Sequence, residues 1–94
     1  MKFVPRHFVL ALTAAVLPFA VSAQSYPSKP VTVVVPFSPG GGTDIGARLI
    51  AQKLTAKWGQ SVIVENRAGA GGLVGADLVA KAKPDGYTLF MTTN

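Results

Sequence analysis

The stretch VTVVVPFSPGGGTD, residues 31–44, decides the fold class of this chain. Its first part, Val31–Pro36, is a run of β-branched residues closed by a proline, which predicts a buried strand. The prolines and glycines that follow, within Phe37–Gly42, predict a turn. A strand that ends in a glycine turn is typical of the units from which α/β proteins are built.

A helix is expected directly after this turn. Thr43 or Asp44 can serve as its N-cap, and we place the helix at Asp44–Trp58, with Gly59 as its stop. Four large apolar residues form an approximate stripe along it, with Ala47 and Ala51 filling in: Ile45, Leu49, Leu54 and Trp58. We expect Trp58 to pack against the protein rather than to contact a ligand.

The same pattern then restarts. A strand, a glycine turn, a helix and a further strand are predicted at Val62–Val64, Gly69–Gly72, Leu73–Lys83 and Tyr87–Thr92. A shift of 29 positions aligns the two strand–turn–helix units and places Gly46 on Gly75. Common ancestry and the shared composition of any two such units explain this alignment equally well. In either case, two successive units imply three parallel strands joined by right-handed crossovers.

Parallel strands place both glycine turns at one edge of the sheet, where open α/β sheets bind ligands. Glycines let successive N–H groups converge on an anion, and the helix N-terminus adds unpaired donors and partial positive charge. We therefore predict a carboxylate or phosphate site at this edge. Two roles remain open for Asp44, namely the helix cap and an acceptor for a ligand hydroxyl, amine or water. The second glycine turn serves either the ligand or only the geometry of the chain.

Other residues at the strand ends also have alternative roles. Asn66 and Arg67 end the second strand at the predicted edge. Arg67 can hold a carboxylate or brace a loop against Glu65 or Asp85, and we favour the brace. Phe37 either walls a ligand chamber or belongs to the core. Polar contacts are expected, from position alone, from four further residues: Ser38, Thr92, Thr93 and Asn94.

Several function classes are disfavoured. The dinucleotide fingerprint requires glycine or alanine where Ile45 and Val74 stand, and no G-x-x-x-x-G-K-[ST] motif occurs. Residues 24–94 contain neither cysteine nor histidine, since the only histidine is His7. The commonest general base, the thiol nucleophile and the usual metal ligands are therefore missing, and we expect no catalytic residue, metal or cofactor there. The basic residues are scattered without a dense run, which argues against nucleic acid.

The N-terminus reads as a cleaved signal peptide, residues 1–23. Lys2 and Arg6 form a positive region, an uncharged apolar run follows from Phe8 to Val21, and small residues precede a cleavage point after Ala23. The alternative is an uncleaved membrane helix. It is disfavoured because the apolar run is shorter than the roughly 20 residues needed to span a bilayer and a proline interrupts it.

Four stretches of the chain resemble a known family in order and spacing. They are YPSKPV (26–31), VVPFSPGGGTD (34–44), VENRAGAGG (64–72) and KPDGYTL (83–89). They look like the signatures of the substrate-binding receptors of tripartite tricarboxylate transporters, also called Bug-type proteins. Ala68 is a departure, because many relatives carry proline there. The resemblance implies a type II periplasmic-binding-protein fold, with two α/β domains and a ligand cleft between them.

The resemblance also implies a domain organisation and a set of site residues. Residues 24–94 would be the N-terminal part of the first α/β domain, with the rest of that domain and the second domain absent. A ligand carboxylate would be contacted by the loop after the first strand, the second glycine turn and the last residues of the chain. The implied ligand-binding residues are Phe37, Ser38, Gly41, Gly42, Thr43, Asp44, Ala70, Gly71, Gly72, Thr93 and Asn94.

The expected function is therefore that of a periplasmic receptor. It would capture a di- or tricarboxylate, an amino acid or an aromatic acid and deliver it to the membrane subunits of a tripartite tricarboxylate-type transporter. It would catalyse no reaction and would not be embedded in the membrane once processed. The alternative is an exported α/β hydrolytic enzyme whose catalytic residues lie beyond residue 94. A third interpretation takes the 94 residues as a complete product, such as a pseudogene remnant.

Overall fold

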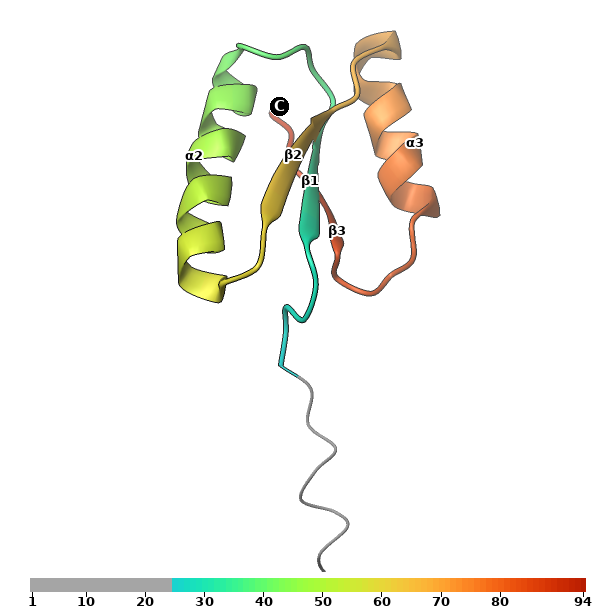
Figure 1. The fold of residues 1–94 in the computed structure, drawn as a ribbon. Coiled ribbons are helices and arrows are strands. Elements are labelled where there is room, and N and C mark those ends of the chain that lie inside the picture. The colour runs from blue at the N-terminus through green and yellow to red at the C-terminus, as the bar shows by residue number, and fades with distance from the viewer. Residues whose placement is uncertain (1–24) are drawn as a thin grey trace, which may run out of the picture.

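The computed structural model describes residues 25–94, so the predicted signal peptide lies outside the described residues. The order of elements is β-α-β-α-β, with one short 3₁₀ turn before the second helix (Figure 1). The elements are β1 (Val31–Val35), α2 (Gly42–Trp58), β2 (Val62–Asn66), η2 (Ala70–Gly72), α3 (Leu73–Lys81) and β3 (Thr88–Phe90). The predicted α/β class and element order are confirmed.

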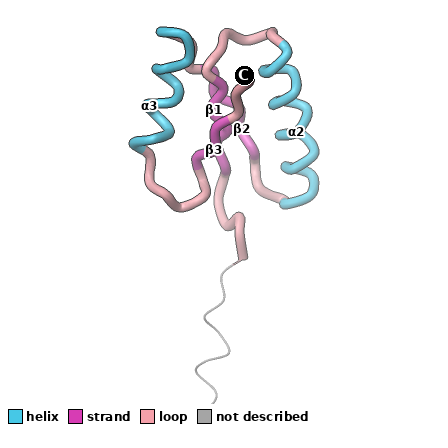
Figure 2. The backbone as a smooth tube through the Cα atoms, turned by 180° about the vertical axis from the view of Figure 1, so that it is seen from behind, coloured by secondary structure: helices cyan, strands magenta, loops and turns pink. Residues whose placement is uncertain are grey.

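The three strands form one parallel sheet in the order β2-β1-β3. In its register, Val33 of β1 lies opposite Val64 of β2 on one side and Leu89 of β3 on the other. The two helices cover opposite faces of the sheet, as Figure 1 shows and Figure 2 repeats from behind. The first crossover connects β1 to β2 on one side, and the second connects β2 to β3 on the other side of β1. Because both connections are right-handed, the two helices lie on different faces of the sheet.

The core is built around the central strand. Val31, Val34 and Val35 are completely buried, as expected for a strand that is covered on both faces. Val31 and Val33 pack with Ala51 of α2, and Leu54 and Trp58 close this cluster from the side. The structure thus confirms the predicted packing role of Trp58, whose ring also meets that of Tyr26 edge-on at 5.8 Å between centroids.

Helix α2 begins two residues earlier than predicted. Its N-cap is Gly41, in an extended conformation and without a side-chain cap, so the predicted capping by Thr43 or Asp44 is wrong. Glycine allows this start without a capping side chain, and Asp44 falls in the first helical turn instead. The predicted stop is confirmed, because Gly59 adopts the left-handed conformation and its N–H donates to the Thr55 carbonyl.

The apolar stripe predicted for α2 is only partly the buried face. Ile45 and Leu49 are 62% and 55% exposed, whereas Ala47 and Ala51 are buried. The alanines let the helix approach the sheet closely, and the larger residues beside them fall outside the contact. The predicted stripe is therefore confirmed for Ala47, Ala51, Leu54 and Trp58 and wrong for Ile45 and Leu49.

The remaining boundaries differ by a few residues. Strand β2 extends to Asn66, α3 ends at Lys81, and β3 is limited to Thr88–Phe90. Ala82 is already extended, two residues before Pro84. Among residues 25–94, no helix has the length and apolar character needed to cross a membrane.

Candidate functional site

A cavity of about 190 Å³ lies at the carboxyl edge of the sheet. Its lining combines the loop after β1, the first turn of α2 and one residue from beyond β3: Phe37, Gly41, Gly42, Thr43, Asp44 and Thr93. All six belong to the predicted site. They meet because β1 and β3 are adjacent parallel strands, and their pairing continues through the Met91 N–H, which donates to the Val34 carbonyl at 3.0 Å. Figure 2 shows the end of the chain beside the loop that leads into α2.

The other predicted residues lie outside this lining. Ser38 and Asn94 are exposed nearby. The turn Ala70–Gly72 follows β2 at the same edge of the sheet, but it packs against the end of β1, where a Cβ on Gly72 would lie 3.7 Å from Pro36. This turn follows β2 and Thr93 follows β3, and the central strand β1 lies between those two strands. A ligand contact from Ala70, Gly71, Gly72, Ser38 or Asn94 stays a prediction.

The N-terminus of α2 supplies backbone donors to the cavity wall. The first helical hydrogen bond runs from the Ile45 N–H to the Gly41 carbonyl, at 2.9 Å. The N–H groups of Gly42, Thr43 and Asp44 precede that bond and have no partner within the helix. Together with the positive end of the helix dipole, they suit an anion or another strong acceptor.

The Asp44 side chain is buried and held by four hydrogen bonds from three neighbours. Its Oδ2 accepts from the Gly40 N–H at 2.9 Å, and its Oδ1 accepts from Asn66 Nδ2 at 2.9 Å. Arg48 Nε lies 3.1 Å from both oxygens. Asn66 extends the network, because Nδ2 also donates to the Phe37 carbonyl at 3.1 Å and Oδ1 accepts from Arg48 Nη2 at 2.7 Å. These bonds tie the loop after β1 to both α2 and β2.

The sequence pattern alone did not predict this network. The Asp44–Arg48 pair could have been predicted from spacing, because an acid and a base four residues apart on a helix commonly form an ion pair. Asn66 was noted at the edge, but its three partners lie 18, 22 and 29 residues away, and only the tertiary fold brings them together. Arg67 pairs with Glu65, one of the two acids predicted for its bracing role, with 2.8 Å between Nη2 and Oε1.

The hydrogen bonds to Asp44 make a pH-dependent contribution to stability. The Gly40 N–H foremost, then Asn66 and Arg48, lower the pKa of this carboxyl below its ordinary value. A lowered folded-state pKa stabilises the protein above the pKa of the unfolded chain, and this gain is lost as the pH falls through the folded-state pKa. We expect the melting temperature of the full-length protein to fall more steeply below about pH 4 in wild type than in Asp44→Asn. Parallel curves for the two proteins would contradict this assignment.

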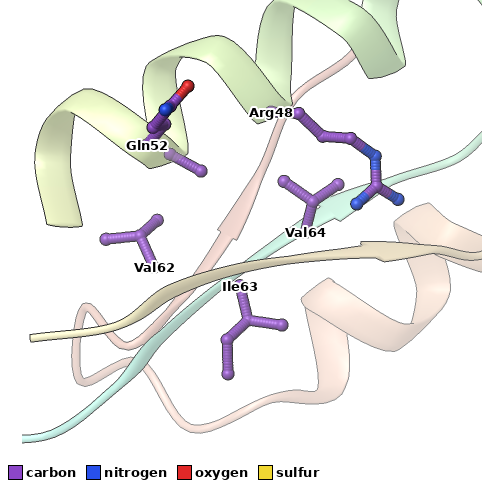
Figure 3. A pocket seen from close by; sticks show the side chains of 6 residues that line it. Arg48, Gln52, Val62, Ile63 and Val64 are labelled. Atoms are coloured by element: carbon purple, nitrogen blue, oxygen red, sulfur yellow. The ribbon is translucent and has the colours of Figure 1, made fainter.

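A second, larger cavity of about 410 Å³ lies between α2 and β2 (Figure 3). It is lined by Arg48, Ala51, Gln52, Val62, Ile63 and Val64. Figure 3 shows Val62 and Val64 directed toward the helix and Ile63 directed to the other face of the strand. None of the predicted ligand-binding residues lines it.

Within residues 25–94, there is no group of three or more side chains suited to hold a metal ion.

Comparison with known proteins identifies what the chain is similar to. A family model described as "Tripartite tricarboxylate transporter family receptor" matches residues 46–94. The protein BugT of Bordetella pertussis is 51% identical over 74 residues, which cover 79% of this chain and 23% of BugT. This chain therefore spans about a quarter of the length of the curated relatives that it matches.

Two solved structures from Rhodopseudomonas palustris share the fold. One protein, solved with adipate, is 48% identical with a TM-score of 0.69, over 70% of this chain and 22% of that chain. The other, MatC with bound malate, is 51% identical with a TM-score of 0.65, over 69% of this chain and 22% of that chain. The solved periplasmic binding protein BugD is also similar, at 49% identity with a TM-score of 0.65 over 69% of this chain and 22% of that chain. This likeness confirms the predicted relation to the periplasmic-binding-protein type of fold.

Proposed function

Because this chain belongs to the family of tripartite tricarboxylate transporter receptors, we propose that it forms part of a periplasmic receptor for a small carboxylate. The receptor binds its ligand without chemical conversion and delivers it to membrane transporter subunits. Residues 24–94 form the N-terminal part of the first of two α/β domains, and the ligand lies in the cleft between the domains. The N-terminal pattern of residues 1–23 supports export to the periplasm.

The observation that carries the proposal is the cavity at the N-terminus of α2. Its glycines present backbone rather than side chains, and its helix N–H groups are donors without helical partners. Such donors bind a carboxylate without any basic side chain. In the proposed complex, one ligand carboxylate meets the N–H groups of Gly42, Thr43 and Asp44, and Phe37 walls the ligand. The hydroxyl of Thr93 is a further donor.

The proposed ligand class is a dicarboxylate. Adipate and malate, the molecules named for the two Rhodopseudomonas palustris structures, both carry two carboxylates. The cavity beside α2 would take one of these groups, which leaves the second to residues of the other domain or to the turn Ala70–Gly72. A ligand that bridges two domains stabilises the closed arrangement, because it contacts both domains only there.

Ligand-induced stabilisation of the full-length mature protein tests this proposal. At a ligand concentration of about 100 times its dissociation constant, the free energy of unfolding should rise by about 2.7 kcal/mol. Thermal unfolding is measured with malate, adipate, citrate, aspartate and benzoate, in protein refolded to remove bound ligand. A selective increase with one or more of the acids that carry at least two carboxylates is the expected result, and benzoate serves as the monocarboxylate comparison. An unchanged melting temperature with every acid would refute a carboxylate receptor, and hydrolysis of ester analogues would then support the hydrolytic alternative.

A further inference from the structure

We infer that Asp44 positions the ligand-binding loop of this receptor, acting with Arg48 and Asn66 as an internal clamp, and that its carboxylate is not a ligand contact. This inference rests on the proposed function, because it assigns the means by which the proposed carboxylate site is held in its binding geometry. According to this inference, the buried negative charge of Asp44 increases the affinity of the neighbouring site for an anionic ligand.

The clamp holds the loop after β1 at two points. At its distal end, the Gly40 N–H donates to Asp44 Oδ2 at 2.9 Å, immediately before the cavity residues Gly41 and Gly42. At its proximal end, the Phe37 carbonyl accepts from Asn66 Nδ2 at 3.1 Å. Asn66 also donates to Asp44 Oδ1, so the two ends of the loop are connected through one amide and one carboxylate. The clamp thus holds the cavity residue Phe37, and the Gly40–Asp44 bond holds the cavity residues 41–43 between its two partners.

The Asp44 carboxylate has little capacity left for a ligand. Its oxygens already accept from the Gly40 N–H, from Asn66 and twice from Arg48. The residue is only 3% exposed although it lines the cavity. A carboxylate is an acceptor without protons to donate, so it has nothing to offer an incoming carboxylate except repulsion. Arg48, whose side chain is 52% exposed, supplies the compensating charge from the side of β2.

Two physical effects of Asp44 on an anionic ligand have opposite signs. If the residue acted only through its charge, removing that charge would leave Arg48 uncompensated and would raise the affinity for a dicarboxylate. If it acts by positioning, the same change weakens binding, because Gly40 and Asn66 donate to different oxygens of Asp44 and the amide of asparagine has only one oxygen. The loop then loses its fixed geometry. The direction of the change in affinity therefore separates positioning from simple electrostatics.

The experiment compares Asp44→Asn with wild type in the full-length mature protein, by isothermal titration at a temperature where both are folded. The ligand used is whichever of malate, adipate or citrate stabilises the wild type. We expect Asp44→Asn to weaken binding by roughly tenfold or more, as the loss of charge-assisted hydrogen bonds in a binding site does. Asp77→Asn is the matched control, since Asp77 pairs with Lys81 at the same spacing on α3, with 2.9 Å between Oδ2 and Nζ, and lies on an exposed surface.

Hydrogen exchange at the Gly40 amide is a second measurement. General destabilisation would accelerate exchange throughout the protein, whereas loss of the clamp would accelerate it selectively at Gly40. We expect exchange at this amide to accelerate in Asp44→Asn while the amides of β1 keep their protection. If Asp44→Asn fails to fold, Asn66→Ala takes its place, because it releases the Phe37 end of the loop and leaves the Asp44–Arg48 pair intact. The same loss of affinity is expected for it.

Unchanged or increased affinity in the folded variant would overturn the clamp. A wild-type protein that binds none of the acids would instead refute the proposed function, so the two failures are distinguishable. A loss of affinity in Asp77→Asn equal to that in Asp44→Asn would also overturn the clamp, because it would show a general effect of removing helix ion pairs.

Discussion

Gly75→Ala is expected to lower the free energy of unfolding by about 1–3 kcal/mol, although it adds a single methyl group. A Cβ at this position would lie 2.9 Å from Pro36 Cβ, 3.1 Å from Pro36 Cα and 3.1 Å from the Arg67 carbonyl oxygen. These atoms belong to a completely buried proline and to the backbone, so they cannot move away without shifting the end of β1. The extra methyl group would push α3 off the sheet beside the turn Ala70–Gly72.

The matched control for this prediction is Gly46→Ala. Apart from the neighbouring residues and the backbone of α2 itself, no atom lies within 4 Å of the position that a Cβ on Gly46 would take. In the middle of α2, alanine is favoured over glycine by up to about 1 kcal/mol, so this variant should be neutral or more stable. Denaturant unfolding of both variants in the full-length protein measures the difference. Equal stabilities would show that α3 does not pack closely on Pro36.

Gly42→Leu is expected to abolish measurable ligand binding while leaving the protein folded. Gly42 lines the cavity at the first position of α2, and no atom lies within 4 Å of the position that its Cβ would take. A leucine side chain can therefore be accommodated by the fold, but it would occupy space in a cavity of about 190 Å³ and screen the helix N–H groups. Isothermal titration with the ligand that stabilises the wild type gives the affinity.

Ala56→Leu is the control for the effect of adding a leucine to the same helix. Ala56 is exposed on α2 and lies outside both cavities. We expect wild-type affinity for Ala56→Leu and a melting temperature within a few degrees of wild type for both variants, as is usual for exposed helix positions. Wild-type affinity in a folded Gly42→Leu protein would place the ligand away from the N-terminus of α2.

Gly46 and Gly75 occupy equivalent positions in the two aligned units but differ in their packing. The shift of 29 positions places one on the other, yet only Gly75 is in tight contact with its surroundings. The reason lies in the different positions of the two helices on the sheet. The first turn of α3 and the glycine turn before it pack onto Pro36, the residue that follows the central strand β1. The corresponding part of α2 faces the cavity and its exposed rim. Similar local sequence thus supports different packing.

The local pattern of the sequence determined the elements and the edge at which the site lies. Runs of β-branched residues, glycine turns and a helix stop at Gly59 are local signals, and right-handed crossovers make the strands parallel. Parallel strands bring the loop after β1 and the residues after β3 to the same edge. For that reason the sequence pattern was enough to place Phe37, Thr43 and Thr93 at this edge, and the family resemblance grouped them in one site.

Only the tertiary structure decided how the site is held together. The helix starts at Gly41 without a side-chain cap, and the side chain of Asp44 bonds to Gly40, Arg48 and Asn66 instead. The Asn66 contacts depend on the register of β2 against β1 and on the face of the sheet that α2 covers. A periodic sequence pattern does not encode these choices, because they follow from close packing between segments distant in the chain. The sequence therefore determined which residues gather at the edge, and tertiary packing decided which of them face the cavity and which hold its wall.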